Sequence, residues 1–124
     1  MKSRRFLIAL ALTVLVPSAA LRAADITGKW TASFDTQIGQ QHYTYDFKVT
    51  GTQLTGKAKS DNGESELKDG KVNGDTVTFV ENLDFQGMAL RIEYTGKIVS
   101  DDEIKFTRKV ADIATEELVA KRSK

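Results

Sequence analysis

The 124-residue chain contains no cysteine, and this absence removes several kinds of chemistry at once. No disulfide can form, so the folded part of the chain depends on its core alone for stability. Thiol catalysis and thiolate metal sites are excluded, because both need a cysteine sulfur. A lipoprotein anchor is excluded as well, since its lipid is attached to a cysteine that follows the export signal.

Histidine and proline each occur once. Pro17 lies near the N-terminus, so no proline interrupts extended segments in the rest of the chain. His42 has no cysteine or second histidine near it, and a metal site needs several convergent ligands. We therefore expect an exposed structural role for His42, no metal ion and no cofactor. The chain also lacks a Ser–His–Asp or phosphate-loop constellation, which makes an enzyme the less favoured class of protein.

The first 24 residues have the layout of a secretory signal peptide, in which we expect a helix. Lys2, Arg4 and Arg5 form a basic segment, and residues 6–16 form an apolar run that Pro17 ends. This order of charges, apolar run and small residues is typical of an export signal. The run is shorter than the about 20 residues that a membrane-spanning helix needs, which disfavours an uncleaved anchor.

Two cleavage points fit the small residues that end this segment. Cleavage after Ala20 fits the small-x-small rule best, whereas cleavage after Ala24 places Arg22 at the poorly tolerated third position before the cut. In either case we expect residues 25–124 to form a single exported domain, periplasmic or secreted, without a stable membrane anchor. Its length is that of one domain with one modest core.

The net charge changes once the signal is set aside. The whole chain has 18 lysines and arginines against 17 aspartates and glutamates. Four of the basic residues precede Asp25, so the rest of the chain carries 14 basic and 17 acidic residues, a net charge of −3. A nucleic-acid partner is disfavoured, because its binding needs a basic stripe.

An alternation of apolar and polar residues starts just after the signal. In residues 27–36, Trp30, Ala32 and Phe34 fall on one face of an extended strand, with polar side chains on the other. The pattern repeats between polar turns such as residues 61–63, where Asn-Gly supplies the positive φ angles of a tight hairpin. The later strands are expected at residues 41–50, 53–60, 64–72, 76–85, 88–99 and 103–110.

Two of these strands stand out. The strand at residues 53–60 places Gly56 and Ala58 inward, and small inward residues suit a point where the wall curves or a neighbour approaches closely. The strand at residues 64–72 is the least apolar, with little beyond Leu67 and Val72, which suits an edge or a wet wall.

The last segment of the chain has two interpretations. Residues 111–124 are rich in Ala, Glu, Leu and Lys, which favour a short helix, but residues 115–122 also alternate as a strand with Leu118 and Ala120 inward. We prefer the strand, because pairing it with the first strand closes the sheet and removes both open edges. The predicted fold class is therefore all-β, an eight-stranded antiparallel up-and-down barrel. Side chains can fill such a barrel, or it can hold one small ligand.

Gly28, Lys29 and Trp30 match the Gly-x-Trp pattern that opens lipocalins and avidins, the calycin group of barrels. The chain after the signal resembles this group and small exported bacterial barrel domains without an assigned function. The resemblance implies that Trp30 lies inside the closed end of the barrel, with a basic residue from near the last strand packed across it. Arg108 is the candidate for that residue, and Arg122 is the alternative.

The resemblance does not extend to the biotin site of avidins. Avidins line that site with several tryptophans and place a polar residue two positions after the Gly-x-Trp tryptophan, whereas this chain has one tryptophan and Ala32. Lipocalins are usually longer and often contain disulfides, so this chain resembles a reduced version of that barrel.

Two charged residues fall in apolar registers of the expected strands. Glu81 lies between Phe79 and Leu83 on one face, and Arg108 interrupts a similar face later in the chain. An unpaired charge there costs several kcal/mol. Three interpretations stay open: a place near the barrel mouth or a shifted register, a structural pairing with Arg108 stacked on Trp30, or a cavity where a charge orients a polar ligand group.

Aromatic side chains dominate the expected inward faces, and core packing accounts for most of them. The tyrosines add hydroxyl groups to apolar surface, so they are suited to line a ligand pocket as well. The candidate ligand-binding residues are Tyr43, Tyr45, Glu81, Phe85, Tyr94 and Arg108, and the structural signature is Gly28, Trp30 and Arg108.

Three function classes remain. The first is an exported, non-enzymatic barrel that binds a small, mostly apolar molecule inside or at its mouth. The second is a structural module with a filled core that engages another protein of the cell envelope. The third is a small barrel isomerase or cyclase that uses Tyr and Glu or Arg as acid and base. A cavity with converging polar groups favours the first class, and inward Tyr and Glu within hydrogen-bond reach raise the third.

Overall fold

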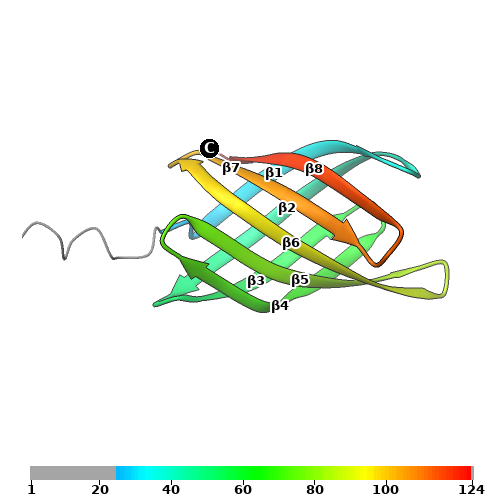
Figure 1. The fold of residues 1–124 in the computed structure, drawn as a ribbon, viewed down its shortest axis with the longest axis horizontal. Helices are drawn as coiled ribbons and strands as arrows, with labels where there is room; N and C mark the ends of the chain where they lie inside the picture. The colour runs from blue at the N-terminus through cyan, green and yellow to red at the C-terminus, as the bar shows by residue number, and fades with distance from the viewer. Residues whose placement is uncertain (1–24, 124) are drawn as a thin grey trace, which may run out of the picture.

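Alternating apolar and polar residues produce eight strands in the computed structural model, which describes residues 25–123 and contains no helix there. The strands are β1 (Gly28–Thr36), β2 (Gly39–Thr50), β3 (Gln53–Ser60), β4 (Gly63–Asn73), β5 (Thr76–Phe85), β6 (Met88–Ser100), β7 (Glu103–Val110) and β8 (Ala114–Arg122). Each strand pairs antiparallel with the next, and β8 pairs with β1 to close the barrel (Figure 1). The all-β barrel with eight strands is confirmed. The signal peptide and its helix lie outside the described residues.

The tail forms the strand β8 rather than a helix, as the closure of the sheet predicted. β4 is the strand that departs most from regular pairing. Its register against β5 shifts between Lys68 and Lys71, and Asp69 in that interval has a φ of +52°. A bulge of this kind changes which residues face inward. It accounts for the weak alternation in this part of the sequence.

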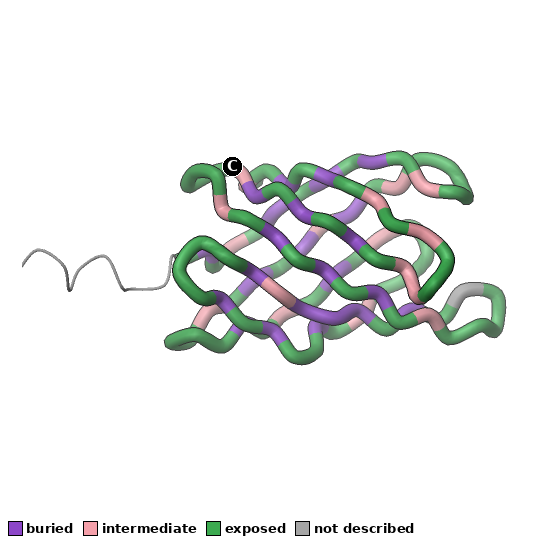
Figure 2. The backbone as a smooth tube through the Cα atoms, in the orientation of Figure 1, coloured by how far each residue is buried: buried purple, intermediate pink, exposed green. Residues whose placement is uncertain are grey.

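Buried and exposed positions alternate along the strands (Figure 2), and the buried side chains fill the middle of the barrel. The filling consists mainly of five aromatic rings, whose contacts have centroid distances of 4.3 to 6.5 Å, all but the shortest within the usual range for aromatic pairs. These rings belong to Tyr45, Phe47, Phe79, Tyr94 and Phe106. The barrel is therefore a packed core over most of its length rather than a hollow tube.

Gly56 marks the close approach that its inward position predicted. Its φ is +141°, and a Cβ atom there would lie 1.7 Å from the backbone carbonyl oxygen of Asp46 on β2. Because that oxygen belongs to the backbone, the neighbour cannot move aside cheaply. Glycine is therefore required where β3 crosses close to β2.

One end of the barrel is closed around Trp30, which is fully buried. The indole nitrogen of Trp30 donates a hydrogen bond to the carbonyl oxygen of Ile26 (2.9 Å), and Ile26 is itself buried. The guanidinium carbon of Arg122 lies 4.6 Å from the centre of the Trp30 ring, and its Nη1 donates to the Thr27 carbonyl (2.9 Å). The residues just before β1 therefore cover this end of the barrel.

The basic residue packed across Trp30 is therefore Arg122, which the sequence analysis gave as the alternative. The first candidate, Arg108, does not pack there. The register explains the difference, because Trp30 and Arg122 are direct partners in the β1–β8 ladder. Arg108 is paired with Tyr94 on β6 and with Glu116 on β8, nearer the other end of the barrel.

The ladder between β1 and β8 is short. The two strands share only two paired positions, Trp30 with Arg122 and Thr31 with Lys121, both toward the closed end. Beyond them no residue of β1 pairs with β8 within residues 25–123. The opposite end is therefore the part of the wall that backbone pairing holds together least.

Candidate functional site

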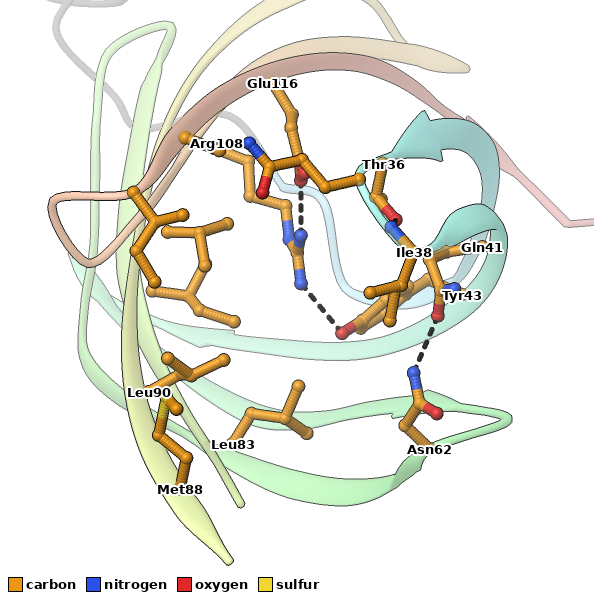
Figure 3. Close-up of a pocket in the computed structure, with 15 residues that line it drawn as sticks. Thr36, Ile38, Gln41, Tyr43, Asn62, Leu83, Met88, Leu90, Arg108 and Glu116 are labelled. Atoms are coloured by element: carbon orange, nitrogen blue, oxygen red, sulfur yellow. Dashed lines mark hydrogen bonds and ion pairs between the residues drawn. The ribbon is translucent and has the colours of Figure 1, made fainter. Parts of the chain in front are cut away.

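A cavity of about 210 Å³ opens at the end of the barrel opposite Trp30. The turns that join β1 to β2, β3 to β4, β5 to β6 and β7 to β8 surround its mouth, as the view in Figure 3 shows. Leu83, Leu90, Ile92 and Val110 supply apolar walls. The packed aromatic rings in the middle of the barrel confine the hollow to this end.

The rim of the cavity carries exposed apolar side chains. Ile38, Met88 and Ile113 come from three different turns, and each is more than half exposed (53%, 57% and 56%). The fourth turn contributes Asn62, whose side-chain amide donates to the side-chain oxygen of Gln41 on the same side of the rim (2.8 Å, Figure 3). Apolar groups at three of the four turns give the mouth a surface that suits an apolar molecule.

The polar part of the lining centres on Arg108, whose side chain is 5% exposed. Its Nη1 donates to Glu116, its Nη2 donates to the Tyr43 hydroxyl (2.9 Å) and its Nε donates to the Tyr94 hydroxyl (2.9 Å). Tyr94, Arg108 and Glu116 are paired positions on the neighbouring strands β6, β7 and β8. Cross-strand register therefore builds this row of polar groups directly from the sheet.

Glu81 lies beneath this row and is 1% exposed. Its carboxylate accepts hydrogen bonds from the hydroxyls of Tyr43 (3.1 Å), Tyr94 (3.0 Å) and Ser65 (3.5 Å), and Nη2 of Arg108 lies 3.8 Å away. Every buried polar side-chain atom in residues 25–123 has a hydrogen-bond partner. The charge in an apolar register is thus compensated by a network that the flanking strands supply.

Burial shifts the acidity of the whole network. It raises the pKa of the Glu81 carboxyl, although Arg108 and the tyrosine hydroxyls oppose the shift. Burial together with the charge of Glu81 raises the pKa of Tyr43 to about 12, and burial raises the pKa of Tyr45 and Tyr94 well above the usual value. All three tyrosines are therefore neutral hydrogen-bond donors near pH 7, not bases.

The raised pKa of Glu81 predicts a pH dependence of stability. The folded state binds the proton of Glu81 more tightly than the unfolded state does, so this carboxyl contributes most below its unfolded pKa. The contribution is lost as the pH rises through the higher folded value. Relative to Glu81→Gln, the wild-type protein should lose unfolding free energy as the pH increases, by at most about 1.4 kcal/mol per pH unit.

Urea unfolding between pH 4 and pH 8, followed by the fluorescence of the single tryptophan, measures this difference. Carboxylates with lowered pKa, such as Asp75 and Glu103, shift stability in the opposite direction but are common to both proteins, so they cancel. If the unfolding free energy of the wild type instead rises with pH relative to that of Glu81→Gln, the pairing of Glu81 with Arg108 outweighs the burial of its carboxyl.

The structure separates the candidate ligand-binding residues into two groups. Tyr43 and Arg108 line the cavity. Tyr45, Tyr94 and Glu81 lie behind them, where the Tyr45 and Tyr94 hydroxyls are 3.0 Å apart and join the network around Glu81.

The other two singled-out residues lie away from this network. Phe85 ends β5, and its side chain is outside the described part. His42 is exposed, with its Nδ1 2.7 Å from the hydroxyl of Ser33.

Glu116 is the residue of the candidate site that the sequence analysis missed. It shares the inward register of Leu118 and Ala120 on β8, so it is a third charge in an apolar alternation. The argument that singled out Glu81 and Arg108 applies to it equally. It was obscured because the segment was ambiguous between a helix and a strand, and a helix would place Leu118 on a different face from Glu116 and Ala120.

In residues 25–123, no group of three or more His, Asp or Glu side chains lies together in a way that could hold a metal ion. No helix there is long and apolar enough to cross a membrane. Comparison of the chain with protein-family models, with curated protein sequences and with solved structures found no match.

Proposed function

We propose that the protein binds a small, mostly apolar molecule in the cavity at the mouth of its barrel. One observation carries the proposal: the barrel is packed except at one end, where apolar walls converge on a buried, hydrogen-bonded polar row. An apolar cavity of about 150 Å³ is enough for benzene. A cavity of about 210 Å³ therefore suits a ligand with on the order of ten non-hydrogen atoms.

We also propose that the protein is exported and that its barrel is calycin-like. The resemblance of the Gly28–Trp30 segment to that group implied a tryptophan in a closed end with a basic residue across it, and the stacking of Arg122 on Trp30 supports this. The basic and apolar layout of residues 1–24 supports export to the periplasm or the medium.

Binding can be tested by blocking the cavity. Ala114 contributes to its lining, so Ala114→Phe should fill it, whereas Ala89→Phe adds the same ring to an exposed position at the same end of the barrel. The probes are small alcohols and cycloalkanes, and the readouts are native mass spectrometry and the thermal unfolding midpoint. A ligand at 100 times its Kd stabilises the folded state by about 2.7 kcal/mol.

We expect adducts and stabilisation for the wild type and Ala89→Phe, and neither for Ala114→Phe. Equal shifts in all three proteins would place any binding outside the cavity. If no probe produces an adduct or a shift, the proposal fails. The exposed side chains of Ile38, Met88 and Ile113 then favour the interaction module, with another envelope protein at the mouth.

A second candidate function rests on the position of Tyr43. Its hydroxyl donates to the buried Glu81 and also belongs to the cavity lining, so it connects the carboxylate to a bound molecule. That arrangement suits an isomerase or cyclase in which the Tyr43 oxygen takes a proton from the bound molecule while its own proton passes to the Glu81 carboxylate, and the reverse transfer returns a proton to the product. Exchange of the α-hydrogens of cyclohexanone in D₂O, faster with the wild type than with Tyr43→Phe or Glu81→Gln, would support this function, and equal rates would exclude it for that ketone.

A further inference from the structure

We infer that the ligand is a cationic amphiphile, whose apolar part lies in the cavity and whose positive charge is held at the mouth. This inference rests on the proposed function and names the chemistry of the ligand at the same site. It follows from the charges around the mouth and from the charges inside the cavity, which are separate observations.

The turns around the mouth carry charge of one sign. The four segments that surround it contain no lysine, arginine or histidine; they are residues 35–41, 60–64, 84–90 and 110–115. Their charged residues are Asp35, Asp61, Glu64, Asp84 and Asp112. Each of the four segments therefore contributes at least one carboxylate to the rim, where Asp35 and Asp84 occupy exposed strand positions and none of the five lines the cavity itself.

Four of these carboxylates are not neutralised by a neighbour. No ion pair within residues 25–123 includes Asp35, Asp61, Asp84 or Asp112. The fifth carboxylate, Glu64, forms one long ion pair, with Lys57 at 3.9 Å. Carboxylates near the closed end are paired instead, for example Asp75 with Lys97 and Glu103 with Lys121. An uncompensated ring of one sign around an apolar opening attracts and orients ligands of the opposite sign.

The charges inside the cavity do not favour an anion either. Arg108 is the one cationic residue in the lining, and each of its three nitrogens is already hydrogen-bonded to Tyr94, Glu116 or Tyr43. With the nearby Glu81 ionised, the two carboxylates outnumber the guanidinium. An anionic head group beside Arg108 would add a third negative charge to a buried site that holds one cation and two carboxylates.

Glu116 adds a hydrogen-bond acceptor to the lining of the cavity. Its side chain is nine-tenths buried, it contributes to the cavity lining, and its Oε1 binds Arg108. Its second oxygen, Oε2, accepts no hydrogen bond from residues 25–123. Because no buried side-chain polar atom in residues 25–123 lacks a partner, Oε2 reaches the solvent in the cavity, where it is available to an N–H group of the ligand.

A matched ligand series tests the inference. Hexylammonium, 1-hexanol and hexanoate share one chain and differ in charge, so their Kd values at pH 7 in 20 mM salt report charge preference directly. We expect hexylammonium to bind about tenfold more tightly than 1-hexanol, since each exposed ion pair contributes about 0.2–1 kcal/mol, and hexanoate to bind least. The advantage of the ammonium should shrink in 200 mM salt, because salt screens exposed charges.

Two variants with equal charge changes locate the effect. The mouth variant combines Asp35→Asn, Asp61→Asn, Asp84→Asn and Asp112→Asn, and the control combines Asp46→Asn, Glu66→Gln, Glu93→Gln and Glu117→Gln at exposed wall positions. The mouth variant should lose the preference for the ammonium and still bind 1-hexanol, while the control should keep it. Hexanoate binding as tightly as hexylammonium, or equal losses in both variants, would overturn the inference. Failure of all three ligands would instead count against the proposed function.

Discussion

Replacing Arg108 with methionine should destabilise the protein by about 3–5 kcal/mol, the range observed when one partner of a buried ion pair is removed. The side chain is 5% exposed and lies against two carboxylates, those of Glu81 and Glu116, which are themselves buried or nearly so. Methionine fills similar volume but offers no donor, so Glu116 loses its hydrogen bond to Arg108, Glu81 loses the neighbouring positive charge, and the Tyr43 and Tyr94 hydroxyls each lose one donor. Urea unfolding followed by tryptophan fluorescence measures the change.

A neutralised triple variant gives the control for this prediction. Arg108→Met combined with Glu81→Gln and Glu116→Gln removes the unpaired charges, and it should recover a large part of the lost stability. Arg91→Met removes an exposed arginine that pairs with Glu93, and it should change stability by less than about 0.5 kcal/mol. If Arg108→Met stays within about 1 kcal/mol of the wild type, the polar row does not hold the mouth together.

The strands and their inward faces could be predicted because both follow from a period of two along the chain. That pattern alone predicts the inward positions of Trp30, Ala32 and Phe34, and all three are buried. Glu81 and Arg108 were found for a related reason, since a charge among apolar residues demands a partner. The sequence could not identify the partners, because those come from strands far apart in the chain and depend on their register.

The depth of a residue along the barrel is what alternation does not predict. Met88 shares the inward face of Ile92 and Tyr94, yet it is 57% exposed because it lies where β6 begins at the mouth. Arg108 and Arg122 are both inward, and only the pairing of β1 with β8 decides that Arg122 reaches Trp30. A cavity depends on where along the axis the large side chains end, and sequence periodicity does not contain that information.

Trp30→Ala should cost about 3–5 kcal/mol, the range for truncating a buried aromatic residue, out of a total stability of about 5–15 kcal/mol for a domain of this kind. Trp30 is fully buried, and truncation leaves a void at the closed end. It also removes the ring under Arg122 and the hydrogen bond to the Ile26 carbonyl. Urea unfolding followed by circular dichroism measures the loss, because the variant contains no other tryptophan.

Two matched variants divide this loss into its causes. Trp30→Phe keeps an aromatic ring but not the indole donor, so it should cost less than Trp30→Ala. Arg122→Met removes the cation from above the ring, an interaction of about 0.5–2 kcal/mol, and it also removes the hydrogen bond to Thr27. Because Trp30 lies at the end opposite the cavity, folded Trp30→Ala protein should bind 1-hexanol as the wild type does. Unchanged stability in Trp30→Ala would contradict the assignment of Trp30 as the centre of the closed end.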